Sequence, residues 1–207
     1  MTDFSQLVQE RHSVRTYEAG VALDDRELRA IFTDVIESPS SFNIQHWQFV
    51  VVRDEARKSE LRGLSFGQSQ VEDCSAVVLV CGRLNAFEDA NRIYADSSDE
   101  QREKYVPMIE GVYHGNPALQ KDEAIRSGSM AAMTLMLAAK NRGWDSGPMI
   151  GFDAAQVGEY LNLENTTLPV MMIVIGKAKD GLQPERGYRR PLEEVVRLES
   201  ADGDALS

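Results

Sequence analysis

The sequence predicts a globular domain in which helices enclose a short buried sheet. Three apolar runs rich in valine, isoleucine and methionine mark the strands, at residues 47–54, 75–83 and 168–178. Strands that are covered on both faces are continuously apolar in this way. A chain of 207 residues is long enough to bury roughly 70% of its unfolded surface. We therefore expect one domain over residues 1–207.

Two helices are expected before the first strand. The first lies within residues 2–11, behind a cap at Thr2 or Asp3. In the second, Asp24 and Glu27 have the three-residue spacing of a capping box. This second helix has to end before the next proline, because proline disfavours helical geometry in the residue that precedes it.

The elements after the first strand follow from composition. Residues 54–64 are polar with a helical pattern, and the charged and aromatic residues that follow the second strand predict a helical insertion over about 84–118. The longest helix is expected over 122–143, where alanine and methionine leave little polar surface. Gly143 suits the C-terminal cap of that helix.

The last part of the chain contains two connecting segments. Residues 144–153, "WDSGPMIGFD", are expected to be a turn-rich connection, and Asp153 is expected to cap a helix through Leu161. The tail, about 180–207, has no apolar core of its own. We expect the tail to dock on another surface, such as a second subunit.

Charge and hydropathy narrow the classes of partner. The net charge is -11 and the sequence pI is near 4.8. Such a chain has no broad basic surface for nucleic acid, although a local group of arginines can still bind a small anion. No apolar run approaches the ~20 residues that cross a bilayer, and the N-terminus lacks the pattern of a signal peptide. We expect a cytoplasmic protein without nucleic-acid or membrane partners.

Common catalytic and metal-binding patterns are absent. The chain has no G-x-G-x-x-G, G-x-x-x-x-G-K-[ST] or G-x-S-x-G motif, and His12, His46 and His114 are not at metal-ligand spacing. Cys74 follows two acidic residues, which favours a buried structural thiol over a nucleophile. Because Cys74 and Cys81 are seven residues apart, they should point to opposite faces of one strand and form no disulfide.

Three polar segments remain. Residues 11–15, "RHSVR", and 187–191, "GYRRP", contain arginines, whose forked guanidinium groups fit phosphate. Each segment alone also fits a solvated helix end or tail. Residues 38–47, "SPSSFNIQHW", alternate polar and apolar side chains, as if one face held a ligand. These segments become informative if folding brings them together.

In this order, the segments resemble those of the FMN-dependent nitroreductase family, especially its small bacterial branch linked to quinone and nitroaromatic reduction. The matching segments are those three, "GQSQVEDCSAVVLV" at 67–80 and "WDSGPMIGFD". The resemblance implies an α+β fold with a mixed, largely antiparallel sheet between helices. It also implies an intertwined homodimer with two FMN sites at the subunit interface, in which the tail reaches the partner subunit.

The resemblance further implies a set of FMN contacts and no catalytic residue beyond them. The residues concerned are Arg11, His12, Ser13, Arg15, Pro39, Ser40, Ser41, Asn43, Gln68, Gln70, Pro148, Met149, Ile150, Gly151, Arg189 and Arg190. Residues 11–13 would hold the phosphate and ribityl chain with Arg189, at the favoured R-x-P position, or Arg190. Arg15 would lie at the N1/O2 edge, where a fixed cation raises the flavin's potential.

The remaining contacts would complete the pocket. Residues 39–43 would come from the other subunit. The backbone of 148–151 would run along the flavin ring, with the N–H of Ile150 or Gly151 near N5, and Gly151 would permit the close approach. Some family members have a glutamate at Ile150, so this pocket should be more apolar.

At the pyrimidine edge of the flavin, this chain differs from relatives that place a lysine there. Gln68 or Gln70 would donate a neutral hydrogen bond instead, which would leave Arg15 as the main cation at that edge.

The activity implied by the resemblance is a ping-pong oxidoreductase. NAD(P)H would give a hydride to FMN and leave, and an electron-poor acceptor, a nitroaromatic or a quinone, would then be reduced. The alternatives are an enzyme of the same fold that acts on another acceptor, such as an enone or a halogenated aromatic, an FMN-binding sensing module without turnover, and a structural dimer without flavin.

Overall fold

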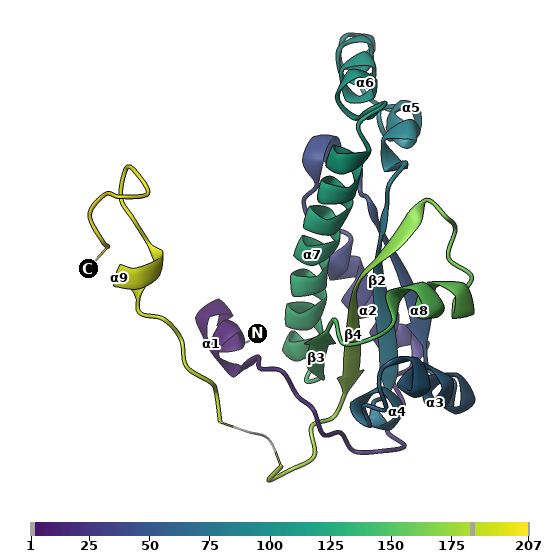
Figure 1. Cartoon of the computed structure of the whole chain (residues 1–207), viewed down its shortest axis with the longest axis vertical. Helices are drawn as coiled ribbons and strands as arrows, with labels where there is room; N and C mark the ends of the chain where they lie inside the picture. The colour runs from purple at the N-terminus through teal and green to yellow at the C-terminus, as the bar shows by residue number, and fades with distance from the viewer. Residues whose placement is uncertain (1–2, 183–184, 207) are drawn as a thin grey trace.

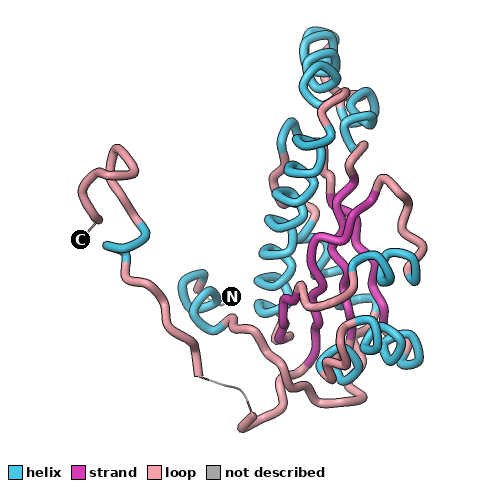
Figure 2. Tube along the Cα trace, in the orientation of Figure 1, coloured by secondary structure: helices cyan, strands magenta, loops and turns pink. Residues whose placement is uncertain are grey.

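Each pair of neighbouring strands in the sheet is antiparallel. The computed structural model describes residues 3–182 and 185–206. Its strands are β1 (Trp47–Val52), β2 (Ala76–Arg83), β3 (Asp145–Met149) and β4 (Thr167–Gly176), in the spatial order β1-β2-β4-β3. A single parallel bridge joins Ser13 to Ser146 at the outer edge of β3. Figure 2 shows these strands together with the helices around them, and the largely antiparallel α+β arrangement is confirmed by the strand pairing.

Helices cover both faces of this sheet (Figure 1). The helices are α1 (Phe4–Glu10), α2 (Asp25–Val35), α3 (Glu55–Leu64), α4 (Gln70–Asp73), α5 (Ala90–Ile93), α6 (Asp99–Tyr113), α7 (Pro117–Asn141), α8 (Ala154–Tyr160) and α9 (Leu192–Val195), with 3-10 turns η1 (Ser41–Asn43) and η2 (Ala86–Asp89). Along β2, Val78 and Val80 pack toward α2 and α7, whereas Val77 and Leu79 pack toward α3 and α8. The continuous valine run is thus explained by burial on both faces.

The helix boundaries follow the expected capping residues. The Asp24 carboxylate accepts the Glu27 N–H at 2.8 Å, Asp3 caps α1, and Asp153 caps α8. Thr2 lies outside the described residues. At the end of α7, Gly143 has φ +74° and the Trp144 N–H returns to the Ala139 carbonyl, which is a Schellman motif.

The segment expected to be a turn-rich connection contains a strand instead. β3 pairs with β4 from Asp145↔Gly176 to Met149↔Met172. Its glycine and proline have low strand propensity, which hides it in the sequence. Pro148 is tolerated because β3 is an edge strand of the four and needs fewer ladder N–H groups. The expectation of a simple connection was wrong, and this strand fixes one wall of the site described below.

The cysteines also differ in part from expectation. Both thiols are free, as expected, but Cys74 precedes β2 and packs in the same core cluster as Cys81. The prediction of opposite faces was wrong because the strand begins only at Ala76. Burial raises the pKa of each thiol to about 12, so both stay protonated and unreactive at neutral pH.

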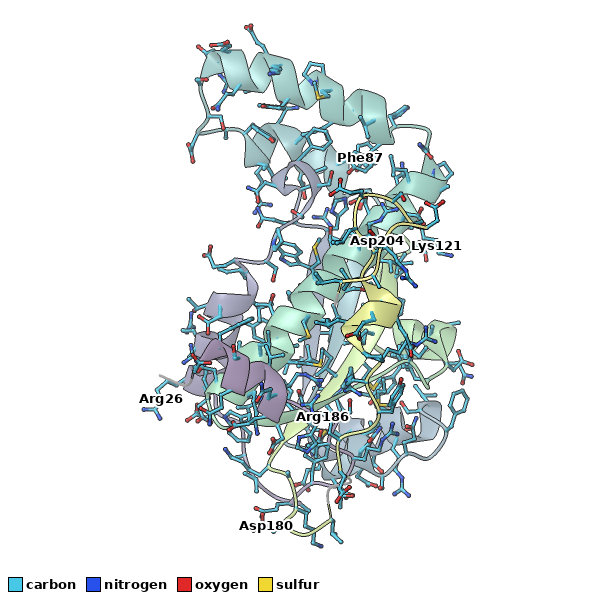
Figure 3. The ribbon with its side chains drawn as sticks, turned by 90° about the vertical axis from the view of Figure 1, so that its left-hand side faces the viewer. Arg26, Phe87, Lys121, Asp180, Arg186 and Asp204 are labelled. Atoms are coloured by element: carbon cyan, nitrogen blue, oxygen red, sulfur yellow. The ribbon has the colours of Figure 1, made fainter. Side chains whose placement is uncertain are left out.

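The segment between β2 and α7 forms a small cluster of its own. It contains η2, α5 and α6, and its core joins Ile44 to Phe87, Ile109 and Tyr113. Phe87 stacks on Tyr113 with ring centroids 6.0 Å apart (Figure 3 labels Phe87). The segment therefore packs directly on the loop that precedes β1.

The C-terminal tail stands away from the sheet and its helices (Figure 1). Its described residues, 185–206, are exposed with few exceptions and hold α9 and a bridge between Arg197 and Ala205. Apolar side chains there, including Leu192 and Val195, are more than half exposed. The tail has no core within one chain, as the sequence indicated.

Candidate functional site

A hollow of about 260 Å³ beside β3 collects three segments of the chain. Its lining residues are Ser13, Val14, Arg15, Gln68, Gln70, Gly147, Pro148, Met149, Ile150 and Gly151. The candidate residues from 13–15, 68–70 and 148–151 therefore meet in one place. Ligand pockets usually measure about 300–1,000 Å³, so a single chain offers only part of the enclosure that a cofactor of flavin size needs.

The hollow exists because the N-terminal segment lies close against β3. The Val14 N–H donates to the Ser146 carbonyl at 3.0 Å, and the Tyr17 hydroxyl donates back to the Val14 carbonyl at 3.1 Å. A Cβ at Gly147 would overlap the Val14 carbonyl oxygen. Gly147 thus permits the contact that places Arg15 over the hollow.

Replacing Gly147 with alanine is expected to destabilise the fold by about 3 kcal/mol, at the upper end of the usual cost of overpacking, because the obstacle is backbone. Chemical denaturation of the purified protein measures this effect. Gly63→Ala is the matched control, since its Cβ meets nothing within 4 Å and the site is helical. An equal stability of the two variants would contradict the close packing of residues 13–15 on β3.

Gln68 holds the turn after β3. Its Nε2 donates to the carbonyls of Gly151 at 2.6 Å and Ser65 at 3.0 Å. Gln70 is buried, and its Nε2 lies 3.2 Å from Gln68 Oε1 and 3.4 Å from Met149 Sδ. Both hydrogens of the Gln68 amide are thus engaged within the chain, so its role in this structure is to fix the backbone of 149–151.

A cluster of arginines lies next to these segments, at the end of α1. Burial, followed by the nearby charges of Arg186 and Arg189, lowers the pKa of the Arg11 guanidinium. The Nη2 of Arg186 donates to the carbonyls of Val8, Gln9 and Arg11 (Figure 3). In the described part of the chain, no carboxylate forms an ion pair with these three arginines.

Two buried side-chain nitrogens in this cluster have no hydrogen-bond partner: the Nε of Arg11, which is a donor, and the Nε2 of His12. The Nδ1 of His12 donates to the Glu10 carbonyl at 2.9 Å, so Nε2 is a second donor only when the ring is doubly protonated. An unpaired buried donor beside uncompensated positive charge fits an anion such as a phosphate. The cluster therefore suits the phosphate end of a nucleotide cofactor.

Sequence reasoning missed Arg186, which lies one residue before the "GYRRP" segment. The only signal in the sequence was that Arg186 lies three residues before Arg189 and so belongs to the same basic segment. Its hydrogen bonds to backbone carbonyls could not be predicted, because any residue type supplies such a carbonyl. The charge of Arg189 contributes to the lowered pKa of Arg11, so Arg189 lies near the end of α1.

The remaining candidate residues, 39–43, lie in a loop before β1 with an unusual backbone. Phe42, Asn43 and Gln45 have φ angles of 51°, 55° and 56°. Non-glycine residues rarely adopt this left-handed conformation, and such strain persists only where the surroundings impose it. Pro39 and Asn43 are exposed, and Ser40 and Ser41 are half-buried.

One chain does not bring this loop to the hollow. The loop leads into β1, whereas the hollow borders β3, and these edges of the sheet are three strand spacings or about 14 Å apart. The loop contacts α5 and α6 through Tyr94 and Tyr113, at the opposite end of the molecule from α4 (Figure 1). Among the described residues, no hydrogen bond joins the loop to residues 13–15 or 147–151.

A second, larger hollow of about 600 Å³ lies between residues 20–25, 53–58 and 74–75. Its cations are already engaged: Arg53 pairs with Asp25, and the buried Lys58 donates to the carbonyls of Glu72 and Cys74. No lysine or arginine of this hollow is therefore free for an anion, although the buried Ser75 hydroxyl in its lining has no hydrogen-bond partner.

Two further features bear on the chemistry. Within residues 3–182 and 185–206, no helix has the length and apolar content that crossing a bilayer requires. Over the same residues, histidine, cysteine and carboxylate side chains form no group of three that could hold a metal ion.

His46, at the end of the loop, is buried, and its Nδ1 lies 3.1 Å from the Ser127 hydroxyl. Burial is the largest cause of its lowered pKa; Arg83 also lowers it and Glu123 opposes the shift. Because the folded pKa lies below the unfolded value, stability is complete above the unfolded value and is lost as the pH falls through the folded one.

We therefore expect the melting temperature to fall between pH 7.5 and pH 5, and to fall less in His46→Gln, which cannot titrate. Thermal unfolding across this range measures the difference. An identical pH dependence in both proteins would contradict the burial of a neutral His46.

Comparison with known proteins places the chain in a family. The model of the Nitroreductase family matches residues 8–177. The chain is 39% identical over 203 residues, which are 95% of this chain and 98% of the relative, to MhqN of Bacillus subtilis, a protein named as an NAD(P)H nitroreductase. The chain therefore belongs to the nitroreductase family.

Two other relatives inform the site. A nitroreductase from Exiguobacterium sibiricum, solved in complex with FMN, has a TM-score of 0.88 and 33% identity, covering 95% of this chain and 97% of that chain. The CLA biosynthesis enone reductase of Lactiplantibacillus plantarum is 29% identical over 85% of this chain and 86% of the relative.

Proposed function

We propose that this chain is an FMN-dependent oxidoreductase that passes a hydride from NAD(P)H to a nitroaromatic or quinone acceptor by a ping-pong mechanism. One observation carries the proposal: the arginines at the end of α1, with the unpaired Nε of Arg11, adjoin the hollow beside β3. The FMN complex of the Exiguobacterium relative supports the cofactor, and the name of MhqN supports the nicotinamide and the nitro acceptor.

The phosphate end of FMN would be held by the arginine cluster. Arg11 would donate to phosphate oxygens through its unpaired Nε, and Arg189 would add a second guanidinium. His12 would donate through Nε2 in its doubly protonated form, because its Nδ1 already donates to the Glu10 carbonyl. Ser13 lines the hollow next to them and would reach the ribityl chain. Arg186 would support this set through its hydrogen bonds to carbonyls at the end of α1.

The ring end would lie along the turn after β3. FMN supplies a ring nitrogen, N5, that accepts a hydride and passes it on. Gly151 is fixed by Gln68, so its backbone and that of Ile150 would meet the ring as a preorganised wall. Arg15 lines the same hollow, is exposed and forms no ion pair with any described residue, so it would provide the positive charge at the pyrimidine edge, near Gln70.

We propose that the site is completed in a homodimer. Residues 39–43 cannot reach the hollow of their own chain, and Pro39 and Asn43 are exposed there. α7 exposes Met130 and Met133 on the stripe that continues to the half-buried Leu137, and such an apolar stripe suits a subunit interface. Two chains placed in opposite directions would bring each loop to the other chain's hollow.

The tail would strengthen this dimer. Leu192, Val195 and Leu198 are each at least 42% exposed on a segment with no contact to its own sheet (Figure 1). The partner's body is the surface on which these side chains would be buried. We also propose a cytoplasmic location, where NAD(P)H is supplied and both free cysteines remain reduced.

The visible spectrum of the purified protein tests the proposal. Flavin absorbance bands are expected, and anaerobic NADH or NADPH should bleach them. Re-oxidation by a panel of a nitroaromatic, a quinone and an enone then identifies the acceptor. The enone is the second candidate because the Lactiplantibacillus relative is an enone reductase. A yellow protein that neither nicotinamide bleaches would contradict an enzymatic role and favour sensing.

A further inference from the structure

Two tyrosines of the segment between β2 and α7 hold the strained loop before β1. The Tyr113 hydroxyl donates to Ser41 Oγ at 2.9 Å, and the Tyr94 hydroxyl donates to the Phe42 carbonyl at 3.1 Å. The two hydroxyls thus bind adjacent residues of the loop, Tyr94 from the end of α5 and Tyr113 from the end of α6. Phe42 is the bulkiest residue of the loop in the left-handed region, where a large side chain is a true outlier.

The tyrosines are themselves firmly placed. Tyr113 is 1% exposed and contacts Phe87, Phe42 and His46 by its ring. Tyr94 stacks on Tyr105, with ring centroids 5.5 Å apart. Loop strain of this kind survives only where packing imposes it, so these rings are a sufficient cause of the loop's conformation.

The hydrogen bond from Tyr113 also leaves the hydrogen of the Ser41 hydroxyl available to another acceptor. A serine hydroxyl has one hydrogen and two acceptor lone pairs, and Tyr113 occupies one lone pair. No other hydrogen bond of the Ser41 hydroxyl occurs among the described residues, so its own hydrogen is free to point out of the loop. Accepting a bond from Tyr113 polarises that hydroxyl and makes it a better donor.

We propose that Tyr113 and Tyr94 are positioning residues for FMN binding: they hold the Ser41–Asn43 turn so that the Ser41 hydroxyl donates to a flavin bound mainly by the partner subunit. This inference rests on the proposed function and deepens it. It makes the segment between β2 and α7 of one subunit a determinant of cofactor affinity in the other subunit's site.

Phenylalanine substitutions test the proposal, because they remove the hydroxyls and keep the rings. The FMN dissociation constant of the reconstituted protein is expected to rise about 3- to 10-fold in Tyr113→Phe and in Tyr94→Phe, the range for loss of one hydrogen bond. Tyr105→Phe is the matched control, since the Tyr105 hydroxyl forms no hydrogen bond within the described part of the chain. Its dissociation constant should stay within about twofold of wild type.

A double-mutant cycle separates positioning from a general loss of packing. If Tyr113 acts through Ser41, then Ser41→Ala combined with Tyr113→Phe should bind FMN no more weakly than Ser41→Ala alone. Multiplied effects in the double variant, or equal affinities of Tyr113→Phe and Tyr105→Phe, would overturn the inference. Absence of FMN binding by the wild type would instead overturn the proposed function, so the two failures are distinguishable.

Discussion

The substitution Arg15→Ala is expected to slow the reduction of bound flavin by NAD(P)H about 100-fold. This is the lower end of the rate loss usually seen when one preorganised electrostatic contact is removed. Arg15 lines the hollow beside β3, and no carboxylate of residues 3–182 or 185–206 forms an ion pair with it. Its charge would stabilise the negative charge that reduction builds at the pyrimidine edge. Because the phosphate is held elsewhere, FMN content should change much less than the rate.

Two variants control this measurement. Arg15→Lys keeps the positive charge and should recover part of the rate. Arg26→Ala removes an arginine from the exposed surface of α2, away from the hollow, and should leave the rate unchanged (Figure 3). Anaerobic stopped-flow absorbance measures all three. Full FMN content with a wild-type rate in Arg15→Ala would contradict the assignment of Arg15.

A glutamate at Met130 is expected to convert the protein to a monomer and to weaken FMN binding at least 100-fold. Met130 is 39% exposed on the apolar stripe of α7, and a charge buried there in a dimer would be unpaired. Loss of the partner would also remove residues 39–43 from the site. Sedimentation and FMN titration of the same sample measure both effects.

Ala56→Glu is the matched control for that change. It adds the same charge to an exposed position of α3, on the opposite face of the sheet from α7. It should remain dimeric and bind FMN normally. A monomeric Met130→Glu variant that keeps normal FMN affinity would show that one chain suffices for the site.

Much of the fold could be predicted from the sequence because its signals are local. Asp24 and Asp153 cap the helices at which they were expected, and the valine run of β2 is buried on both faces. β3 could not be predicted in this way, because "DSGPM" has no strand propensity and pairs only through contacts with β4, far along the chain.

The candidate site also has one part that could be predicted from the sequence and one part that could not. Residue types that bind phosphate were recognisable in "RHSVR", but the grip of Arg186 on α1 carbonyls and the engagement of Gln68 with Gly151 depend on tertiary placement. The strain at Phe42 was equally hidden, because its cause lies in Tyr94, more than fifty residues away.

The central claim is that each flavin site combines the hollow of one chain with the loop of the other. A mixed dimer tests it directly. One chain carries Ser41→Ala and Asn43→Ala, the other carries Arg11→Ala and Arg15→Ala, and each homodimer should bind FMN poorly. The mixed dimer contains one site with no substitution, so we predict one tightly bound FMN per dimer. If the mixed dimer binds FMN as poorly as both homodimers, the hollow and the loop act within one chain, and the account is contradicted.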